Sequence, residues 1–564
     1  MINLTVIRRY ATFLRMEKQG KDCMKRKRQE TCNNGKANTG SKLSSSYFAR
    51  MTRTVEHYEP WFPWVIAATY FVIMGYLMFR YHRIGGLGVE TDFYVELVPQ
   101  AKKLLDGRFS PLNYGAKGPV YSFLLAGTYS IVRDYFYAGL LLNLLSGAVF
   151  LCTIYVLIKK VFNFMTSLLV ILAVSFNYVF LSYTYQAASD LPFMALCVLS
   201  MYFLFRSNNI RDMIFSALWG SLAFLTRYNG AFIVIGSLLY IAAAPDFVRK
   251  RLKRILLWIA VFVTVGLPWF IPNWIATGSP VHNDNYMNVM MEYYALGKEG
   301  VSYENWTDAL PKKFTGMGDI FFYDPVYFLI HMVHNTGEHF LADMKELLGW
   351  RLGLAVIVGF ILFWFAAPDR KKLVYVSFGV MYFLILTLVF YNVRFSLYLL
   401  TCYLPLGVWP FTERKLTGRL KHFSWIPLSI IGFIVLSYVY TTPRIVLAEI
   451  KSTPSYLSDL KDLGCALDKI EPDKSKKIIG RKPHVAYFAG LEAVMFPENV
   501  TSVEDLVGFC RVNGIDYILY SGIEASLRPH VRVLLNVDQK HPGLEKVYHN
   551  RFGVIYRVTG LHEQ

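Results

Sequence analysis

Long apolar runs constrain this chain more than any other feature of its sequence. Examples are WFPWVIAATYFVIMGYLMF (61–79), ILLWIAVFVTVGLPWFIPNWI (255–275) and IPLSIIGFIVLSYVY (426–440). Such runs are roughly long enough to cross the ~30 Å hydrocarbon core of a bilayer. Because a backbone in lipid must satisfy its own hydrogen bonds, they predict helices rather than strands. With 54% hydrophobic and only 18% charged residues, the sequence is typical of a polytopic α-helical membrane protein.

The net charge of +19 raises the question of a nucleic-acid partner, but its distribution argues against one. Basic islands occur at 159–160, 249–254, 369–372 and 413–421, and they alternate with neutral or acid-bearing loops. This alternation is the positive-inside pattern, with additional attraction to anionic lipid headgroups. The aromatic residues lie mainly within the apolar runs and form no base-stacking platform. We therefore expect membrane lipids, and no nucleic acid, as partners.

The positive-inside rule predicts a topology of about 11 transmembrane helices with a cytoplasmic N-terminus. Residues 1–60 are expected to form a basic, disordered cytoplasmic arm, followed by a transmembrane domain over 61–443. External loops are expected at about 81–136 and 276–347. The predicted membrane segments are about 61–80, 137–158, 164–183, 191–205, 213–226, 230–244, 255–275, 350–366, 373–391, 395–411 and 424–441.

The composition changes near residue 444 to that of a soluble domain. The runs IDYILYSG (515–522) and VYHNRFGVIYRV (547–558) predict a strand and a strand pair. Residues 444–564 are thus expected to form a small α/β domain, extracytoplasmic by the predicted topology. Cys465 and Cys510 both fall in it, and a disulfide between them is one possibility in an oxidising compartment.

Six ionisable residues map to the external membrane boundary. They are Asp92, Glu96, Lys117, Asp190, Arg227 and Arg394. Each alone is more often an interfacial anchor than a functional group, but ionisable groups at membrane depth are costly, and a cluster on one face indicates a functional site. The cluster holds both signs of charge. That combination suits a reaction in which a hydroxyl loses a proton while a phosphate departs.

The segment VETDFYVELVPQAKKLLDG (89–107) carries the first of these acids. Its apolar residues recur at helical spacing, which predicts an amphipathic helix along the headgroup layer. Proline removes a backbone hydrogen bond and disfavours helical conformation in the residue before it. Pro99 therefore predicts a break at Val98–Pro99 into two short helices.

Several of these features together resemble a known family. They are a first helix followed by an acid in an amphipathic external loop, the KGP of residues 117–119, a second external acid before the 191–205 segment, and a small C-terminal domain with RKPHVAYFAG (481–490) and VNGIDYILYSG (512–522). The pattern resembles the GT-C superfamily of membrane glycosyltransferases, closest to bacterial relatives of protein O-mannosyltransferases and aminoarabinose transferases, the family 39-like group. That family often has Asp-Glu in the first loop. Here Phe93 follows Asp92, so Glu90 or Glu96 is left to fill the second acid's place.

The resemblance implies inverting transfer of a sugar from a polyprenyl-phosphate donor to an acceptor hydroxyl of a protein, lipid or glycan, on the outer face of a bacterial plasma membrane. Asp92 would be the general base, with Glu96 and Asp190 as further carboxylates. Cations would stabilise the departing lipid phosphate. The candidates for binding substrate or phosphate are Lys117, Arg227, Tyr228, Arg394 and, in a loop after the 255–275 segment, His282.

A divalent metal ion remains an open possibility. His331, His334 and Glu338 share one helical face in HMVHNTGEH (331–339), a spacing that can bind zinc. An interfacial helix with solvated histidines is the commoner reading of such a pattern.

The alternative to an enzyme is a lipid or solute transporter or flippase. Transporters of that kind place ionisable residues near the bilayer midplane and often show a pair of broken helices in two inverted halves. The ionisable residues of this chain collect at one face instead. A membrane scaffold would have no use for such a charge cluster.

Overall fold

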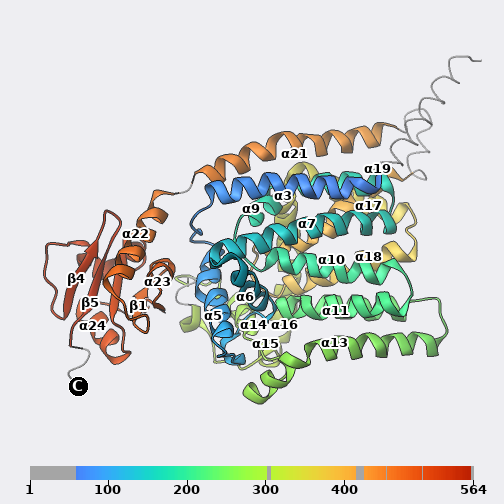
Figure 1. Ribbon diagram of the computed structural model, residues 1–564. Helices are drawn as coiled ribbons and strands as arrows, with labels where there is room; N and C mark the ends of the chain where they lie inside the picture. Colours follow the sequence, from blue (N-terminus) through green and yellow to red (C-terminus); the bar gives the residue numbers. More distant parts are fainter. Residues whose placement is uncertain (1–58, 302–305, 414–424, 453, 498–499, 561–564) are drawn as a thin grey trace, which may run out of the picture. The chain divides into compact units, whose positions relative to one another are not determined.

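Helices make up most of this chain, as Figure 1 shows. The computed structural model describes residues 59–301, 306–413, 425–452, 454–497 and 500–560, so the predicted N-terminal arm lies almost wholly outside the described residues. Each predicted membrane segment coincides with helical structure. The helices are α3 (Phe62–Tyr81), α7 (Tyr135–Val161), α8 (Phe164–Ser175), α9 (Tyr178–Thr184), α10 (Asp190–Arg206), α11 (Ile210–Thr226), α12 (Ala231–Ala242), α13 (Val248–Thr277), α17 (Trp350–Phe365), α18 (Arg370–Leu386), η8 (Phe395–Leu399) with α19 (Leu400–Thr412), and α21 (Trp425–Lys451).

Five helices in the described part of the chain are long and apolar enough to cross a membrane, or six if the bent pair α8 and α9 counts as one span. These two helices meet at 57°. Asn177 accounts for the break: its side-chain oxygen accepts a hydrogen bond from the Phe180 amide at 2.9 Å and caps α9, while its amide group donates to the Leu347 carbonyl at 2.7 Å. The architecture is that of a polytopic membrane protein, whereas the number of eleven spans stays a prediction.

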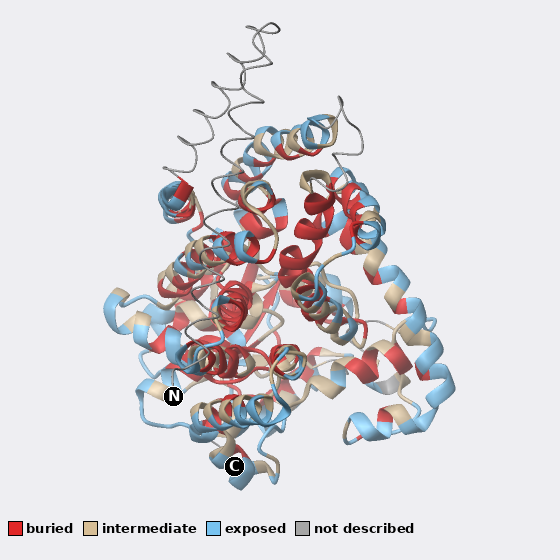
Figure 2. Ribbon diagram, turned by 90° about the vertical axis from the view of Figure 1, so that its right-hand side faces the viewer, coloured by how far each residue is buried: buried red, intermediate tan, exposed pale blue. Residues whose placement is uncertain are grey.

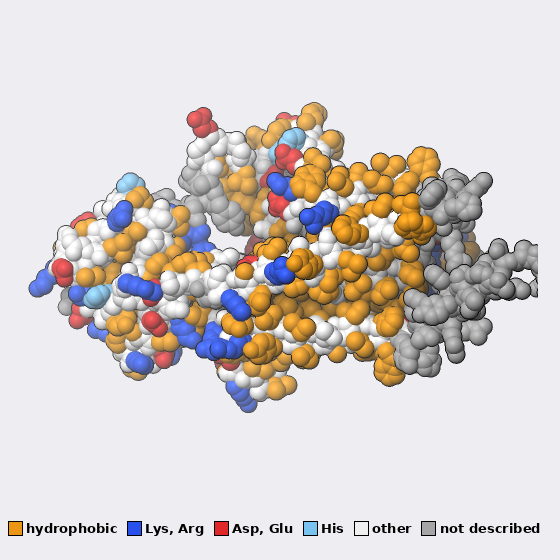
Figure 3. Space-filling view, turned by 90° about the horizontal axis from the view of Figure 1, so that it is seen from above, with side chains coloured by type: hydrophobic (Ala, Val, Ile, Leu, Met, Phe, Trp, Pro, Cys, Tyr) orange, Lys and Arg blue, Asp and Glu red, His pale blue; other side chains and the backbone are white. Residues whose placement is uncertain are grey.

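The core of the helical region lies around α7 and α10. Nearly every side chain of α10 is buried, and Figure 2 shows buried residues concentrated on the inner helices. The outer helices α13, α17 and α21 expose large apolar side chains such as Ile271, Phe360 and Phe433. On the face that Figure 3 draws, hydrophobic side chains predominate over the helical region. Such a surface is suited to lipid rather than to water.

Short helices collect at one end of the bundle, which we term the loop end (Figure 1). One group connects α3 to α7, and the other connects α13 to α17. They are α4 (Glu90–Asp92), η2 (Phe93–Leu97), α5 (Val98–Leu105), η3 (Pro111–Asn113), α6 (Val120–Val132), α14 (Asn285–Met290), η5 (Met291–Ala295), η6 (Trp306–Ala309), α15 (Met317–Tyr323), α16 (Pro325–Ala342) and η7 (Asp343–Leu347). A further 3-10 turn, η4 (Tyr228–Gly230), links α11 to α12 at the same end.

The predicted helix break at Val98–Pro99 is wrong. Residues 90–105 form one continuous helix, because the backbone of Asp92, Phe93, Leu97 and Val98 is helical throughout. Within it, η2 is a π-helical turn in which the Val98 amide donates to the Phe93 carbonyl. The wider turn is the reason the helix tolerates Pro99, since inserted π turns rearrange the backbone hydrogen bonds next to a proline.

Residues 455–560, the C-terminal domain, contain a five-stranded sheet of order β2-β1-β3-β5-β4. Strand β1 (Lys477–Gly480) is parallel to β2 (Glu492–Met495) and β3 (Tyr517–Ser521), whereas β5 (Gly553–Val558) is antiparallel to β3 and β4 (Leu544–His549). Its helices are α22 (Ser455–Ile470), α23 (His484–Ala489), α24 (Val503–Val512), α25 (Gly522–Leu527) and η10 (Pro529–Leu535). Alternate residues of β3 face two separate hydrophobic clusters, as expected for a sheet buried on both faces.

The disulfide considered from the sequence does not form in this structure, because Cys465 and Cys510 are both free. Cys510 is buried in the cluster that contains Ile518 and Tyr520 of β3. The helix α22, which carries Cys465, packs its leucines into the cluster with Tyr517 and Leu519. The two thiols therefore belong to opposite faces of the sheet.

Candidate active site

Five of the predicted ionisable residues line one cavity of about 500 Å³ at the loop end. The cavity lies between the 88–96 segment, the residues before α6, the α11–α12 connection, α14 and the residues before η8. Segments far apart in the sequence thus contribute to one site. The five residues are Asp92, Glu96, Lys117, Arg227 and Arg394.

Asp92 is the accessible acid of the cavity. Its Oδ2 atom accepts a hydrogen bond from Nη2 of Arg394 at 3.0 Å and lies 3.6 Å from Nζ of Lys117. The side chain of Asp92 is 43% exposed, against 12% for that of Arg394, so a substrate can reach the carboxylate. Burial acts to raise the pKa of Asp92, but the charges of Lys117, Arg394 and Arg227 outweigh it and hold the pKa below 3.8.

Glu96 lines the cavity beside Asp92, whereas Glu90 does not. The Oε2 atom of Glu96 contacts Nζ of Lys117 at 2.5 Å, one helical turn from Asp92. Glu90 is only 1% exposed and faces away from the cavity. Its carboxylate contacts Nε2 of His82 at 3.0 Å and accepts hydrogen bonds from the amides of Gly86 at 2.6 Å and Ala187 at 2.7 Å. Glu90 therefore ties the start of α4 to the segment before α10.

The position of Lys117 depends on Gly118, the next residue of the KGP stretch, whose backbone packs closely against the backbone of Leu225. A Cβ atom on Gly118 would lie 2.1 Å from the Leu225 carbonyl oxygen, so only glycine lets this loop pack against the end of α11. Arg227 follows two residues after Leu225. Pro119 then stands at the start of α6, where its missing N–H costs nothing. The glycine thereby brings Lys117 and Arg227 to the same cavity.

Asp190 contacts two arginines of the cavity, Arg227 and Arg394, without lining the cavity itself. Nη1 of Arg227 forms a buried ion pair with its Oδ1 atom, and Nε of Arg394 lies 3.8 Å from the same oxygen. Both guanidinium groups also approach the Phe395 ring, at 5.5 and 5.2 Å from its centre. The position of Asp190 is suited to orienting cations rather than to contacting a substrate.

Of the two remaining substrate-binding candidates, the structure brings only Tyr228 to the cavity. Its hydroxyl accepts a hydrogen bond from Nε1 of Trp269 at 3.2 Å, which fixes the ring at the cavity wall. His282 lies outside the lining, with Nε2 3.8 Å from Oδ1 of Asp284 and the side chain 48% exposed. The segment after His282 does reach the cavity, through Asn285 and Asn288.

Amide side chains complete the lining, and the sequence analysis missed them. They are Asn229, Asn285, Asn288 and Asn392. Asn285 also donates to the Ala116 carbonyl at 2.9 Å and so joins α14 to the loop that carries Lys117. Amides donate and accept hydrogen bonds equally well and suit a hydroxyl-rich ligand. The sequence did contain one signal for these amides, because Asn285 directly follows the polar run His-Asn-Asp of residues 282–284.

The histidines considered as metal ligands do not converge. Nε2 of His331 contacts Oε1 of Glu292 at 3.1 Å, whereas exposed His334 pairs with Glu338 at 3.5 Å. Among the described residues there is no group of three or more His, Cys, Asp or Glu side chains arranged to hold a metal ion.

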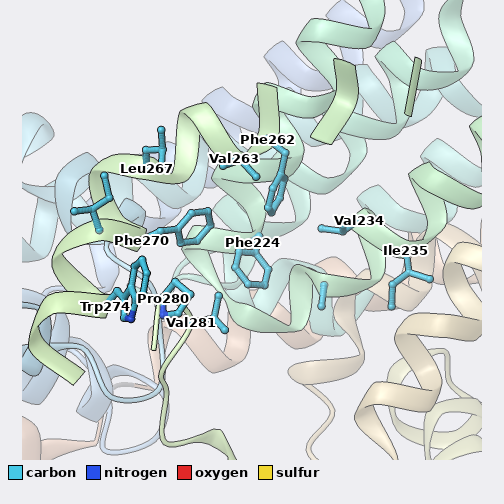
Figure 4. Close-up of a pocket in the computed structure, with 12 residues that line it drawn as sticks. Phe224, Val234, Ile235, Phe262, Val263, Leu267, Phe270, Trp274, Pro280 and Val281 are labelled. Atoms are coloured by element: carbon cyan, nitrogen blue, oxygen red, sulfur yellow. The ribbon is translucent and has the colours of Figure 1, made fainter. Parts of the chain in front are cut away.

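An apolar groove of about 590 Å³ runs beside the cavity, between α11, α12 and α13 (Figure 4). It begins next to the charged site, because Phe224 and Ala231 lie three and four residues from Arg227. Trp274 and Phe270 close one end in Figure 4, and Val234 and Ile235 lie toward the other. The remaining lining residues are Phe262, Val263, Leu267, Ile271, Pro280 and Val281.

The combination of a polytopic bundle, a charged cavity at one end, an adjoining apolar groove and a C-terminal α/β domain resembles the membrane proteins of the GT-C fold. Residues 116–275 match the family model described as dolichyl-phosphate-mannose-protein mannosyltransferase, a stretch that includes Lys117, Asp190 and Arg227. These comparisons confirm the resemblance inferred from the sequence.

Two solved structures illustrate the shared fold. ArnT from Cupriavidus metallidurans, bound to undecaprenyl phosphate, matches with a TM-score of 0.51 and 11% identity over 89% of this chain and 98% of that one. The archaeal oligosaccharyltransferase AglB from Archaeoglobus fulgidus, in complex with an inhibitory peptide and a dolichol-phosphate, matches with a TM-score of 0.54 and 12% identity over 88% of this chain and 74% of that one. Among curated proteins, none matches this chain significantly in sequence.

Proposed function

We propose that this protein is a membrane glycosyltransferase that moves a sugar from a polyprenyl-phosphate donor to an acceptor hydroxyl. The observation that carries the proposal is the accessible carboxylate of Asp92 facing Lys117, Arg227 and Arg394, beside a groove lined by apolar side chains. The family match and the fold shared with proteins that bind undecaprenyl phosphate and dolichol-phosphate support it.

In the proposed reaction the acceptor oxygen forms a bond to the anomeric carbon on the face opposite the phosphate. The bond from that carbon to the phosphate oxygen breaks, and the phosphate leaves with the electron pair. Asp92 takes the proton of the acceptor hydroxyl. Lys117, Arg227 and Arg394 stabilise the charge that develops on the departing phosphate. Attack from the opposite face inverts the configuration at the anomeric carbon.

The ion pairs of Asp92 also suggest how the base is activated. Without substrate, Lys117 and Arg394 lower the pKa of Asp92, and a carboxylate with a low pKa is a weak base. A bound lipid phosphate competes for the same two cations. Their pull on Asp92 then weakens, so its pKa rises when the donor is in place. The acid becomes a better base at the moment when it is needed.

The apolar groove is suited to the isoprenoid tail of the donor. Its lining comes from helices that expose apolar side chains, such as Ile235 and Ile271, to the membrane, so a lipid can enter from the bilayer. Two lining residues of the groove, Phe224 and Ala231, flank Arg227 in the sequence, so a tail bound in the groove would leave its phosphate near the cations. Burial of each CH₂ group contributes about 0.8 kcal/mol, and a chain of several isoprene units would bind with useful affinity.

The basic islands at 159–160, 249–254 and 369–372 lie at the end of α7, the start of α13 and the start of α18. The active cavity lies at the opposite ends of these helices or their neighbours. By the positive-inside rule the basic end faces the cytoplasm. The cavity and the C-terminal domain would then be extracytoplasmic, in the plasma membrane of a bacterium.

The test is transfer by the purified protein in lipid nanodiscs, with a panel of polyprenyl-phosphate sugars and acceptors and mass spectrometry of the polyprenyl phosphate released. We expect Asp92→Asn to lower turnover by about 10²–10⁴-fold and to retain bound lipid phosphate. Asp106→Asn is the matched control, because Asp106 ends the same helical segment outside the cavity and pairs with Arg108. Near-normal turnover by Asp92→Asn would disprove its role as the base, and lipid movement without donor cleavage would favour a transporter.

A further inference from the structure

The segment from Ile84 to Leu97 is shared by two hydrophobic cores. Phe93, Tyr94 and Leu97 are buried in the cluster of the helical bundle. Ile84 belongs to the cluster of the C-terminal domain, and Leu87 packs against that cluster. Residues 63–564 form one compact unit, and this segment is one place where its two cores meet. Asp92 lies between Leu87, which packs against the cluster of the C-terminal domain, and Phe93, which is buried in the cluster of the bundle.

Two side chains just before and at the start of α23 bind the backbone of this segment. The Nε2 atom of His484 donates to the Gly85 carbonyl at 2.9 Å, since a carbonyl can only accept. Nζ of Lys482 donates to the Leu87 carbonyl at 2.8 Å. His484 is fully buried, and burial lowers its pKa, so the ring is neutral and carries its proton on Nε2. We name these two contacts the α23 contacts.

Tyr94 joins the α23 contacts to the helix that carries Asp92. Its hydroxyl accepts a hydrogen bond from the Gly85 amide at 3.1 Å. Its ring lies 4.8 Å from the ring of His484 and 4.4 Å from that of Tyr487. Tyr94 follows Asp92 by two residues in a continuous helix, so a shift of Tyr94 moves Asp92 with it.

Other contacts of the cavity's cations lie within the helical region. Lys117 is set by the packing of Gly118 against Leu225, and Arg227 and Arg394 converge on Asp190, all within the helical region. Relative placement of the base and the cations therefore depends on how the 84–94 segment is held. Glu90 holds it from the side of the bundle, and the α23 contacts hold it from the side of the C-terminal domain.

We propose that the C-terminal domain is a positioning part of the active site, in which Lys482 and His484 hold Asp92 at the distance from Arg394 and Lys117 that the reaction needs. This proposal rests on the proposed function of Asp92 as the base. It gives the domain a role in turnover rather than in binding the donor phosphate, because the α23 contacts do not touch the cations.

The experiment compares full-length Lys482→Ala and His484→Ala with the wild type in nanodiscs. A misplacement of about 1 Å costs up to about 10²-fold in rate, so we expect kcat to fall by about 10- to 100-fold while KM for the donor stays unchanged. His484→Gln keeps an amide donor for the Gly85 carbonyl and should restore much of kcat. Lys546→Ala is the matched control, because Nζ of Lys546 also donates to a backbone carbonyl, that of Val537 at 2.8 Å, inside the same domain.

Hydrogen exchange of the amides of residues 84–94 provides a readout that does not depend on activity. We expect faster exchange there in Lys482→Ala and His484→Ala and wild-type exchange in Lys546→Ala. Unchanged exchange in both alanine variants would overturn the proposal, whether or not the wild type has transferase activity. Absence of transferase activity in the wild type would overturn the proposed function separately. Faster exchange with unchanged kcat would also overturn it and leave the proposed function intact. If kcat of His484→Gln is as low as kcat of His484→Ala, the loss comes from packing rather than from the hydrogen bond. That result would refute the role of the contact with the Gly85 carbonyl.

Discussion

Asp343 gives a prediction whose sign and size follow from the structure. It is fully buried at the start of η7 and accepts hydrogen bonds from the hydroxyls of Tyr391 at 3.2 Å and Tyr403 at 3.0 Å. Burial, the largest influence, raises its pKa from 3.8 to about 7, although these hydroxyls and that of Ser396 act to lower it. Tyr391 precedes Arg394 by three residues, so Asp343 anchors the loop that brings this arginine to the cavity.

The sign of the pH effect follows from proton binding. Between pH 3.8 and about pH 7 the folded protein keeps the proton on Asp343, whereas the unfolded chain has lost it. The folded state binds more protons in this range, so the free energy of unfolding falls as pH rises. For a pKa that differs by about three units, the loss between pH 5 and pH 8 is about 2.5 kcal/mol. Asp343→Asn, which cannot ionise, removes this contribution.

The assay is equilibrium unfolding in mixed micelles at pH 5 and pH 8 for the wild type, Asp343→Asn and the exposed control Asp106→Asn. Two neighbouring groups matter for the design: the charge of Glu346 acts to raise the pKa of Asp343, and the ring of His339 lies 5.3 Å from that of Tyr391. Both groups are present in the wild type and in the variant, so the difference between the two proteins reports on Asp343 in its surroundings. We expect the pH dependence of Asp343→Asn to be smaller by about 2.5 kcal/mol. An unchanged pH dependence would show that Asp343 is ionised in the folded protein and would refute the reasoning.

Three further predictions concern the site and its supports. Gly118→Ala should lower kcat/KM for the donor by about tenfold or more, because the new Cβ displaces the backbone of Lys117; Gly127→Ala, with open space around its Cβ, is the control, and equal kinetics for the two would contradict the packing argument. Val263→Trp should raise KM for long-chain donors but not for short-chain donors if the tail occupies the groove; an equal rise for both would place the tail elsewhere. Glu90→Gln should lower the free energy of unfolding by roughly 1–3 kcal/mol, because an NH₂ group replaces one of the two buried oxygens that accept from the amides of Gly86 and Ala187; a wild-type unfolding curve would refute this structural role.

Much of the fold follows from local patterns in the sequence. Long apolar runs predict helices wherever they occur, and every expected membrane segment coincides with helical structure. The strand pair β4–β5 follows from alternation around the turn of residues 550–552. The ionisable residues meet in space because Asp190, Arg227, Lys117 and Arg394 stand at or just beside helix ends at the loop end of the bundle, where the 90–105 helix also lies. Such a convergence is predictable from topology alone.

The remaining features depend on contacts that no local pattern encodes. The π turn before Pro99 is one of several ways in which a helix can accommodate proline. The role of Glu90 depends on Ala187, which is 97 residues away. Helical spacing did contain a useful signal, because Glu96 is four residues from Asp92 and shares its face, whereas Glu90 is two residues away and points elsewhere.

The charges of the cavity have a further consequence for product release. Lys117, Arg227 and Arg394 are matched by Glu96, Asp190 and Asp92. Under the proposed function, three unmatched cations in a partly buried site would retain the spent polyprenyl phosphate strongly, and each catalytic cycle would wait for its departure. The carboxylates would pair with the cations again as the lipid phosphate leaves, which would limit product inhibition and let one protein molecule serve many donor molecules.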